Sequence, residues 1–225
     1  MTCASSTIKI WVSVILAIVI IGSLTAFAYT SEQNALRAAT VNGMEATVSV
    51  MATQVNASDL AGLKPGDEMS PKYLAVARSL ENMRSMDDTI LNAYVLKVNP
   101  DGTSTFLVDD LYPLDPQGSA KIGEVSTAPD KTEIFHALSG PTSSKQPYTT
   151  KYGSFMSAYA PIDDSVNDSN GNTVAVLAID MSADDYNAAT SKGGLILLTG
   201  IVSMILVVGA IFFGTKGRRD DRKPE

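Results

Sequence analysis

The chain is poor in the residues that bind metals and perform catalysis. Among 225 residues it has one cysteine and one histidine, His136. A single cysteine excludes an internal disulfide, and a zinc site needs several His or Cys ligands that this chain cannot supply. No Gly-rich phosphate loop precedes a helix, and no Ser-His-Asp arrangement is indicated. We therefore expect no catalytic residues, no metal and no cofactor, and a protein that is not an enzyme.

Charge is missing from two long stretches. Ile10–Tyr29 is 20 residues and Gly193–Gly214 is 22 residues without a charged side chain. Each is long enough to cross about 30 Å of hydrocarbon as a helix. The sequence thus predicts transmembrane helices at residues 10–29 and 193–214, with one domain of residues 30–192 between them.

The basic residues near these stretches predict the orientation in the cell membrane. Basic residues follow the second stretch, starting with Lys216, and Lys9 precedes the first. Cationic flanks stay in the cytoplasm, so we expect residues 1–9 and 215–225 inside and the middle domain outside. An alternative makes residues 1–28 a cleaved signal peptide, because Ala26–Ala28 has the small-x-small form of a cleavage site. The apolar run is longer than a usual signal core, which favours the retained anchor.

The middle domain has few basic residues. Residues 30–192 hold 21 acidic and 11 basic side chains. Such an excess is typical of a well-solvated surface. It also attracts cations and repels nucleic acid, so we expect no nucleic-acid partner.

The segment after the first span has a helical pattern of apolar residues. The spacing is 3, 4, 3, 4 for Val41, Met44, Val48, Met51 and Val55. One interpretation is an apolar face that packs on the domain's own sheet. The other is a homodimer in which the Val41–Val55 helix forms a parallel seam with a second copy.

The centre of the domain reads as two strands joined by a tight turn. In Leu91–Asp110, the residues before the turn alternate between two faces of a strand, Asn99–Gly102 is a Pro-Asp-Gly turn, and Thr103–Val108 is the second strand. A helix starting at Ser70-Pro71 precedes it. A long excursion, Leu111–Gly153, with a short helix at 131–138, follows it. Two further strands are predicted at 154–162 and 173–181. Helices followed by hairpins predict an α+β domain, an antiparallel sheet covered by a long N-terminal helix.

Several motifs in this order resemble the Cache, or PDC-type, extracellular sensor domain. They are L-x-P-G-D-E-x-S-P-x-Y at Leu63–Tyr73, A-L-S-G at Ala137–Gly140, Y-G-S-F-M-S-A-Y-A-P-I at Tyr152–Ile162 and V-L-A-I-D at Val176–Asp180. The resemblance covers residues 31–186. It implies a pocket for a small-molecule ligand on one side of the sheet, closed by the excursion between the two hairpins.

The resemblance also implies roles for single residues. Tyr148 and Asp180 stand where members of this family hold the amino group of a ligand. Thr150 stands where the amine-binding pattern has Asp, and the Arg-x-Trp element is missing. These departures weigh against an α-amino acid.

The candidate ligand-binding residues are tyrosines and strand-end carboxylates. Asp180 interrupts an apolar strand, and a buried carboxylate is costly without a partner. It either accepts bonds from a cationic or hydroxylated ligand, or it caps a loop amide or pairs with Lys or Arg. Asp109 has the same position in its own strand, and tyrosines offer apolar area with a polar tip. The predicted ligand-binding residues are Tyr94, Asp109, Tyr148, Tyr159 and Asp180.

The predicted function is sensing of a small molecule outside the cell. Sensors of this type continue into an output module, and here only Thr215–Glu225 follows the second span. We therefore expect the chain to act through a partner, such as a kinase or a chemoreceptor. Alternatives are a ligand-capture subunit of a transporter and a structural envelope protein without a ligand.

Overall fold

The computed structural model describes residues 2–162, 175–191 and 193–220. The chain divides into two units, which are described separately here. One comprises Met1–Arg37 with Thr190–Glu225, and the other is Ala38–Ala189.

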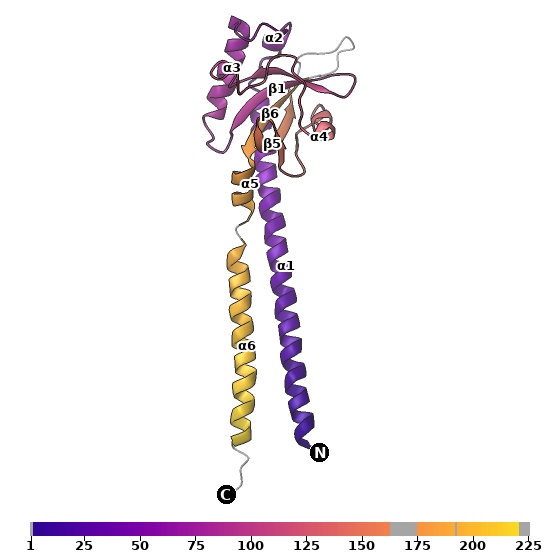
Figure 1. Ribbon diagram of the computed structural model, residues 1–225, viewed down its shortest axis with the longest axis vertical. Helices are drawn as coiled ribbons and strands as arrows, with labels where there is room; N and C mark the ends of the chain where they lie inside the picture. Colours follow the sequence, from indigo (N-terminus) through magenta and orange to yellow (C-terminus); the bar gives the residue numbers. More distant parts are fainter. Residues whose placement is uncertain (1, 163–174, 192, 221–225) are drawn as a thin grey trace. The chain divides into compact units, whose positions relative to one another are not determined.

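The first unit contains two long apolar helices. α1 spans Thr2–Ala52 and also enters the second unit, and α6 spans Gly194–Asp220 (Figure 1). Two stretches, Ile8–Ala52 and Ala183–Phe213, are long and apolar enough to cross a membrane. Large side chains such as Phe27 are exposed along them, as expected of residues that face lipid. The span boundaries and the orientation stay predictions.

The second unit is built on an antiparallel sheet. Its strand order is β2-β1-β6-β5-β3, and β4 pairs with β5. The strands are β1 Asn92–Val98, β2 Ser104–Asp109, β3 Thr142–Ser143, β4 Tyr148–Thr150, β5 Gly153–Pro161 and β6 Ala175–Ser182. The remaining helices are α2 Ala57–Leu60, α3 Pro71–Arg84, α4 Lys131–His136 and α5 Ala183–Thr190. The predicted α+β class, with an antiparallel sheet and a long N-terminal helix, is confirmed.

The turn and helix-cap residues recognised in the sequence form the turn and the cap that they predicted. In the β1–β2 turn, the amide of Gly102 donates to the carbonyl of Asn99 at 3.0 Å, and Gly102 has φ 79°. The side chain of Ser70 accepts from the amide of Tyr73 at 3.2 Å and caps α3. β3 and β4 were not predicted; they lie in a polar segment that pairs with β5. Residues 173 and 174, in the predicted last strand, lie outside the described residues.

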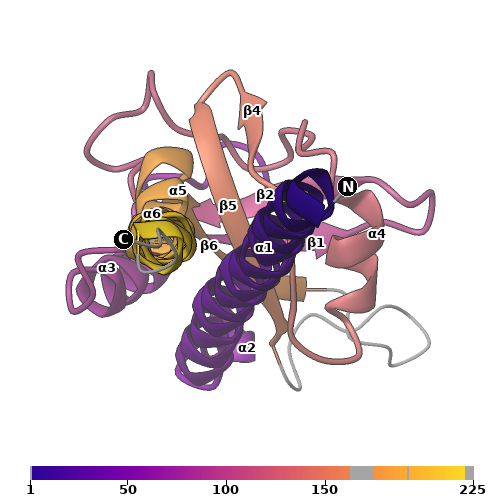
Figure 2. The same ribbon diagram turned by 90° about the horizontal axis from the view of Figure 1, so that it is seen from below.

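The two faces of the sheet carry separate apolar clusters. On β1, Ala93 and Val95 belong to one cluster, and Tyr94 and Leu96 belong to the other. Successive residues of a strand point to opposite faces, which explains this division. Figures 1 and 2 show α3 and α4 on opposite sides of the sheet. The face toward α4 and the excursion carries the pocket described below.

The heptad-spaced residues of α1 pack inside the domain. Met44, Val48 and Met51 of α1, together with Val55 just past the end of this helix at Ala52, are buried in the cluster that also contains Leu177 of β6. The interpretation as an apolar face on the domain's own sheet is therefore confirmed. A homodimer through this helix would need a face other than these four side chains, and it stays a prediction.

A buried ion pair links α3 to the end of β2. The Nε of Arg84 lies 2.5 Å from Oδ2 of Asp110, whose side chain has no exposed surface. We expect Arg84→Met to destabilise the domain by about 3 kcal/mol, because it leaves a buried carboxylate without its cation. The melting temperature should fall by roughly 6–12 °C, measured by calorimetry on the whole chain in nanodiscs. Arg78→Met, an exposed position on the same helix, is the control. Equal shifts in the two variants would contradict the assignment.

Candidate functional site

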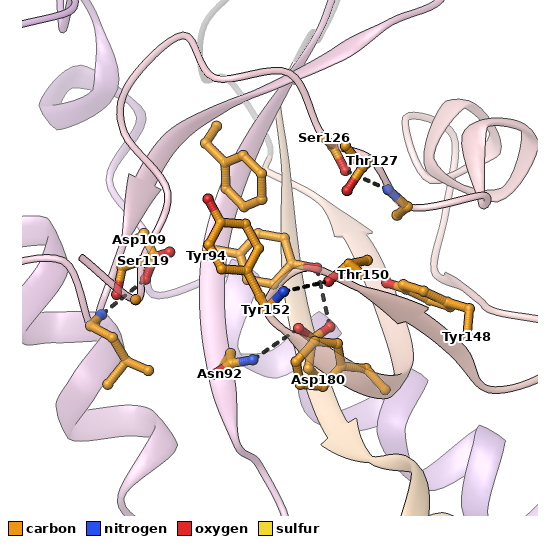
Figure 3. A pocket seen from close by; sticks show the side chains of 15 residues that line it. Asn92, Tyr94, Asp109, Ser119, Ser126, Thr127, Tyr148, Thr150, Tyr152 and Asp180 are labelled. Atoms are coloured by element: carbon orange, nitrogen blue, oxygen red, sulfur yellow. Dashed lines mark hydrogen bonds between the residues drawn. The ribbon is translucent and has the colours of Figure 1, made fainter. Parts of the chain in front are cut away.

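A pocket lies on the face of the sheet that is covered by the excursion. Its free volume, counted over positions that the centre of a water molecule can occupy, is about 70 Å³. That is room for several waters or a small ligand. The lining residues come from β1, β2, β4, β5, β6 and the excursion (Figure 3): Asn92, Tyr94, Phe106, Asp109, Leu111, Gly118, Ser119, Ser126, Thr127, Ala128, Tyr148, Thr150, Tyr152, Phe155 and Asp180.

Asp180 is held in the pocket by neutral donors. Strand register places Asn92 of β1 and Ser157 of β5 directly opposite it. Its Oδ1 accepts from the hydroxyl of Tyr94 at 3.1 Å and from that of Ser157 at 2.5 Å, and its Oδ2 accepts from Nδ2 of Asn92 at 3.1 Å. The residue is 4% exposed. The sheet therefore buries a carboxylate among groups that carry no charge.

Burial governs the titration of Asp180. It raises the pKa of the carboxyl from 3.8 to about 6, while the bonds from Ser157, Asn92 and Tyr94 lower it and the charge of Asp130 raises it. At neutral pH the group is therefore mostly ionised. Within the described ranges, no ion pair joins Asp180 to Lys or Arg. The structure therefore does not show the pairing with a basic residue that the sequence left open.

Asp109 is the second carboxylate of the pocket. Its Oδ1 accepts from the amide of Leu111 at 3.0 Å, and its Oδ2 accepts from the amide of Ala120 at 2.9 Å. These bonds fix the start of the excursion to the end of β2. The pKa of Asp109 is raised to about 6, mainly by burial. The hydrogen bonds from the two amides lower this pKa, and the charges of Asp110 and Asp180 raise it.

Tyrosines connect the pocket to a buried polar group behind it. The hydroxyl of Tyr148 lies 2.7 Å from that of Ser157 and 3.3 Å from that of Tyr159. Tyr159 in turn donates to Oδ2 of Asp130 at 3.0 Å, and Ser144 donates to the same oxygen. Burial raises the pKa of Tyr148 and of Tyr159 above the usual range, so both stay neutral.

Aromatic rings form much of the pocket wall. The ring of Phe106 lies 5.2 Å from that of Tyr94 and 6.3 Å from that of Tyr152, between centroids. Tyr152 is anchored at the rim: its hydroxyl donates to Glu124, whose Oε1 is 2.9 Å from Nζ of Lys151. Among the described residues that line the pocket, none is Lys, Arg or His.

The structure brings most of the predicted site residues together. Tyr94, Asp109, Tyr148 and Asp180 line this pocket, and Tyr159 lies behind Tyr148 without lining it. Whether these residues hold a ligand stays a prediction.

The sequence interpretation did not assign three polar residues to the site. Asn92 and Thr150 line the pocket, and Ser157 bonds Asp180. For Asn92 the signal was the alternation of β1, which places it on the same face as Tyr94. Ser157 and Thr150 needed knowledge of how β5 pairs with β6 and with β4.

No described cluster of three or more His, Cys, Asp or Glu side chains could hold a metal ion. The expectation of a chain without metal, cofactor or enzymatic activity stays a prediction.

No family model and no curated protein sequence matches the chain. Among solved structures, it is similar to the sensor domain of Escherichia coli DcuS, with 13% identity over 70% of this chain and 98% of that one and a TM-score of 0.47. It is also similar to the ligand-binding domain of the Campylobacter jejuni chemoreceptor Tlp3 in complex with L-valine, with 14% identity over 79% of this chain and 67% of that one and a TM-score of 0.42. A third is the periplasmic domain of RsbU from Chlamydia trachomatis, with 13% identity over 74% and 56% of the chains and a TM-score of 0.36.

Proposed function

We propose that the chain is a membrane-anchored sensor that binds a small organic cation, an amine, in this pocket outside the cell and acts through a partner in the membrane. The observation that supports this best is a small pocket with one buried and one half-buried carboxylate, five aromatic rings and no basic lining residue among those described.

The carboxylates favour a positively charged ligand. Raising the pKa of Asp180 from 3.8 to about 6 corresponds to about 3 kcal/mol of unfavourable free energy for its ionised form. A cation beside the carboxylate would recover part of this cost, since an opposite charge favours the ionised state. An anionic ligand would add to the cost. The charge of the pocket therefore selects amines over carboxylates.

The aromatic rings favour the same ligand. A cation within about 6 Å of an aromatic centroid gains about 0.5–2 kcal/mol, more when water is excluded. Tyr94, Phe106 and Tyr152 present rings to the pocket, while Tyr148 and Thr150 offer hydroxyl oxygens that can accept from an ammonium group.

The sensing role rests on the two candidate spans and on the motifs that resemble extracellular sensor domains. In this arrangement the ligand binds outside, and α1 and α6 connect the domain to the membrane. A kinase or a chemoreceptor in the same membrane is the kind of partner that we propose.

A matched set of probes tests the ligand class. We expect n-butylamine to bind the whole chain in nanodiscs by titration calorimetry, and butyrate and n-butanol to bind more than tenfold more weakly. Saturating amine should also raise the melting temperature, because binding at 100 times Kd adds about 2.7 kcal/mol to stability. Tighter binding of butyrate than of butylamine would refute an amine sensor.

A further inference from the structure

The pocket contains two carboxylates on different strands. β1 lies between β2 and β6 in the sheet. In the register, Asp109 of β2 pairs with Tyr94, and Asp180 of β6 pairs with Asn92. Paired residues lie on one face, so both carboxylates and both β1 side chains face the pocket. Figure 3 shows Asp109 beside Ser119 and Asp180 beside Asn92, apart from each other.

The separation follows from the geometry of the sheet. Two strand spacings of about 4.8 Å place the Cα atoms of Asp109 and Asp180 about 10 Å apart across the sheet, and the two-residue offset along β1 adds to this. Both side chains extend into the pocket. The gap is too wide for one small cation to contact both carboxylates, but a chain of several carbons can bridge it.

Neither carboxylate has a basic partner among the described residues. Arg84 pairs with Asp110, which points to the other side of β2, and Lys151 at the pocket rim pairs with Glu124. The two amides that bond Asp109 use one acceptor position on each oxygen, and a carboxylate has about four. Asp109 therefore keeps acceptor capacity and its charge after it has fixed the excursion.

We propose that Asp109 is a second cation-binding residue and that the pocket takes a linear aliphatic diamine, with one ammonium group at Asp180 and the other at Asp109. This inference rests on the proposed function and specifies its ligand class. Tyr94 pairs with Asp109 in the register and donates its hydroxyl to Asp180, so its ring lies between the two carboxylates and would contact the carbon chain. Asp109 thus sets the preference for two charges over one.

Three ligands with the same four-carbon chain test this without altering the protein. They are 1,4-diaminobutane, 4-aminobutan-1-ol and n-butylamine, titrated into the whole chain in nanodiscs at constant ionic strength. We expect the diamine to bind at least tenfold more tightly than the other two, which should have similar affinities. Equal affinity for all three would overturn the diamine inference while leaving an amine sensor intact. If none of the three binds, both proposals fail.

Two variants that each remove one negative charge locate the second ammonium group. In Asp109→Asn the ratio of diamine to monoamine affinity should fall to about one. Asp88→Asn, which changes an exposed residue, should leave the ratio at tenfold or more. A ratio that survives in Asp109→Asn, or that falls equally in Asp88→Asn, would show that the general acidic field and not Asp109 selects the dication. The ratio compares ligands on one protein, so a change in the stability of a variant does not alter its meaning.

Discussion

Replacing Asp180 by Asn is expected to abolish amine binding and, at the same time, to make the ligand-free domain more stable at pH 7. The two side chains have the same shape. Asn retains an oxygen that accepts from Tyr94 and Ser157, and the amide of Asn92 can rotate to accept from the new NH₂ group. The substitution removes a buried charge whose burial costs about 3 kcal/mol by its raised pKa.

Calorimetry and titration on the same samples measure both effects. The melting temperature of ligand-free Asp180→Asn should rise by roughly 6–12 °C at pH 7, while n-butylamine binding should fall at least a hundredfold. Asp88→Asn, at an exposed position, should change neither quantity. If Asp180→Asn binds butylamine normally, Asp180 does not belong to the site. If it is destabilised, the carboxylate serves the fold.

Lowering the pH is expected to weaken amine binding. A primary amine has a pKa near 10 and stays charged, whereas the pKa of Asp180 is about 6. Because only the ionised carboxylate binds the cation, affinity for n-butylamine should fall about tenfold between pH 7 and pH 5. For a diamine the loss should be greater, since the pKa of Asp109 is also about 6.

The stability of the ligand-free domain should change in the opposite direction. Asp109 and Asp180 have a higher pKa in the folded state than the 3.8 of an exposed Asp, so the folded state binds more protons between about pH 4 and pH 6. Their contribution to stability is fully present below pH 4 and is lost as the pH rises through 6. Asp110 and Asp130, with raised pKa, act in the same direction.

Titrations of n-butylamine into the wild type and into Asp180→Asn, from pH 7 to pH 5, test whether protonation of Asp180 causes the loss of affinity. The residual butylamine binding should depend less on pH in the variant than in the wild type, because Asp109, with a pKa of about 6, is then the remaining carboxylate of the pocket. Constant wild-type affinity across this range would contradict binding at an ionised Asp180.

The sequence by itself determined the elements whose causes are local. Pro and Gly at Asn99–Gly102 fix the turn, Ser70 supplies the cap of α3, and the alternation of β1 sends Tyr94 to one face of the sheet. The same patterns identified Asp180 as a carboxylate in an apolar strand. Each of these signals lies within a few residues, where backbone sterics and hydrogen bonding decide the conformation.

Only the tertiary structure decided what surrounds these residues. The spacing of Met44 and Val48 predicted an apolar face on α1, and packing decided that the domain's own sheet covers it. Asp180 receives its donors from Asn92 and Ser157, 88 and 23 residues away, through the register of strands on both sides. Register depends on contacts between distant segments, which no local pattern encodes. For this reason the sequence could name the two carboxylates, and only the folded sheet could place them in one pocket whose described lining has no basic residue.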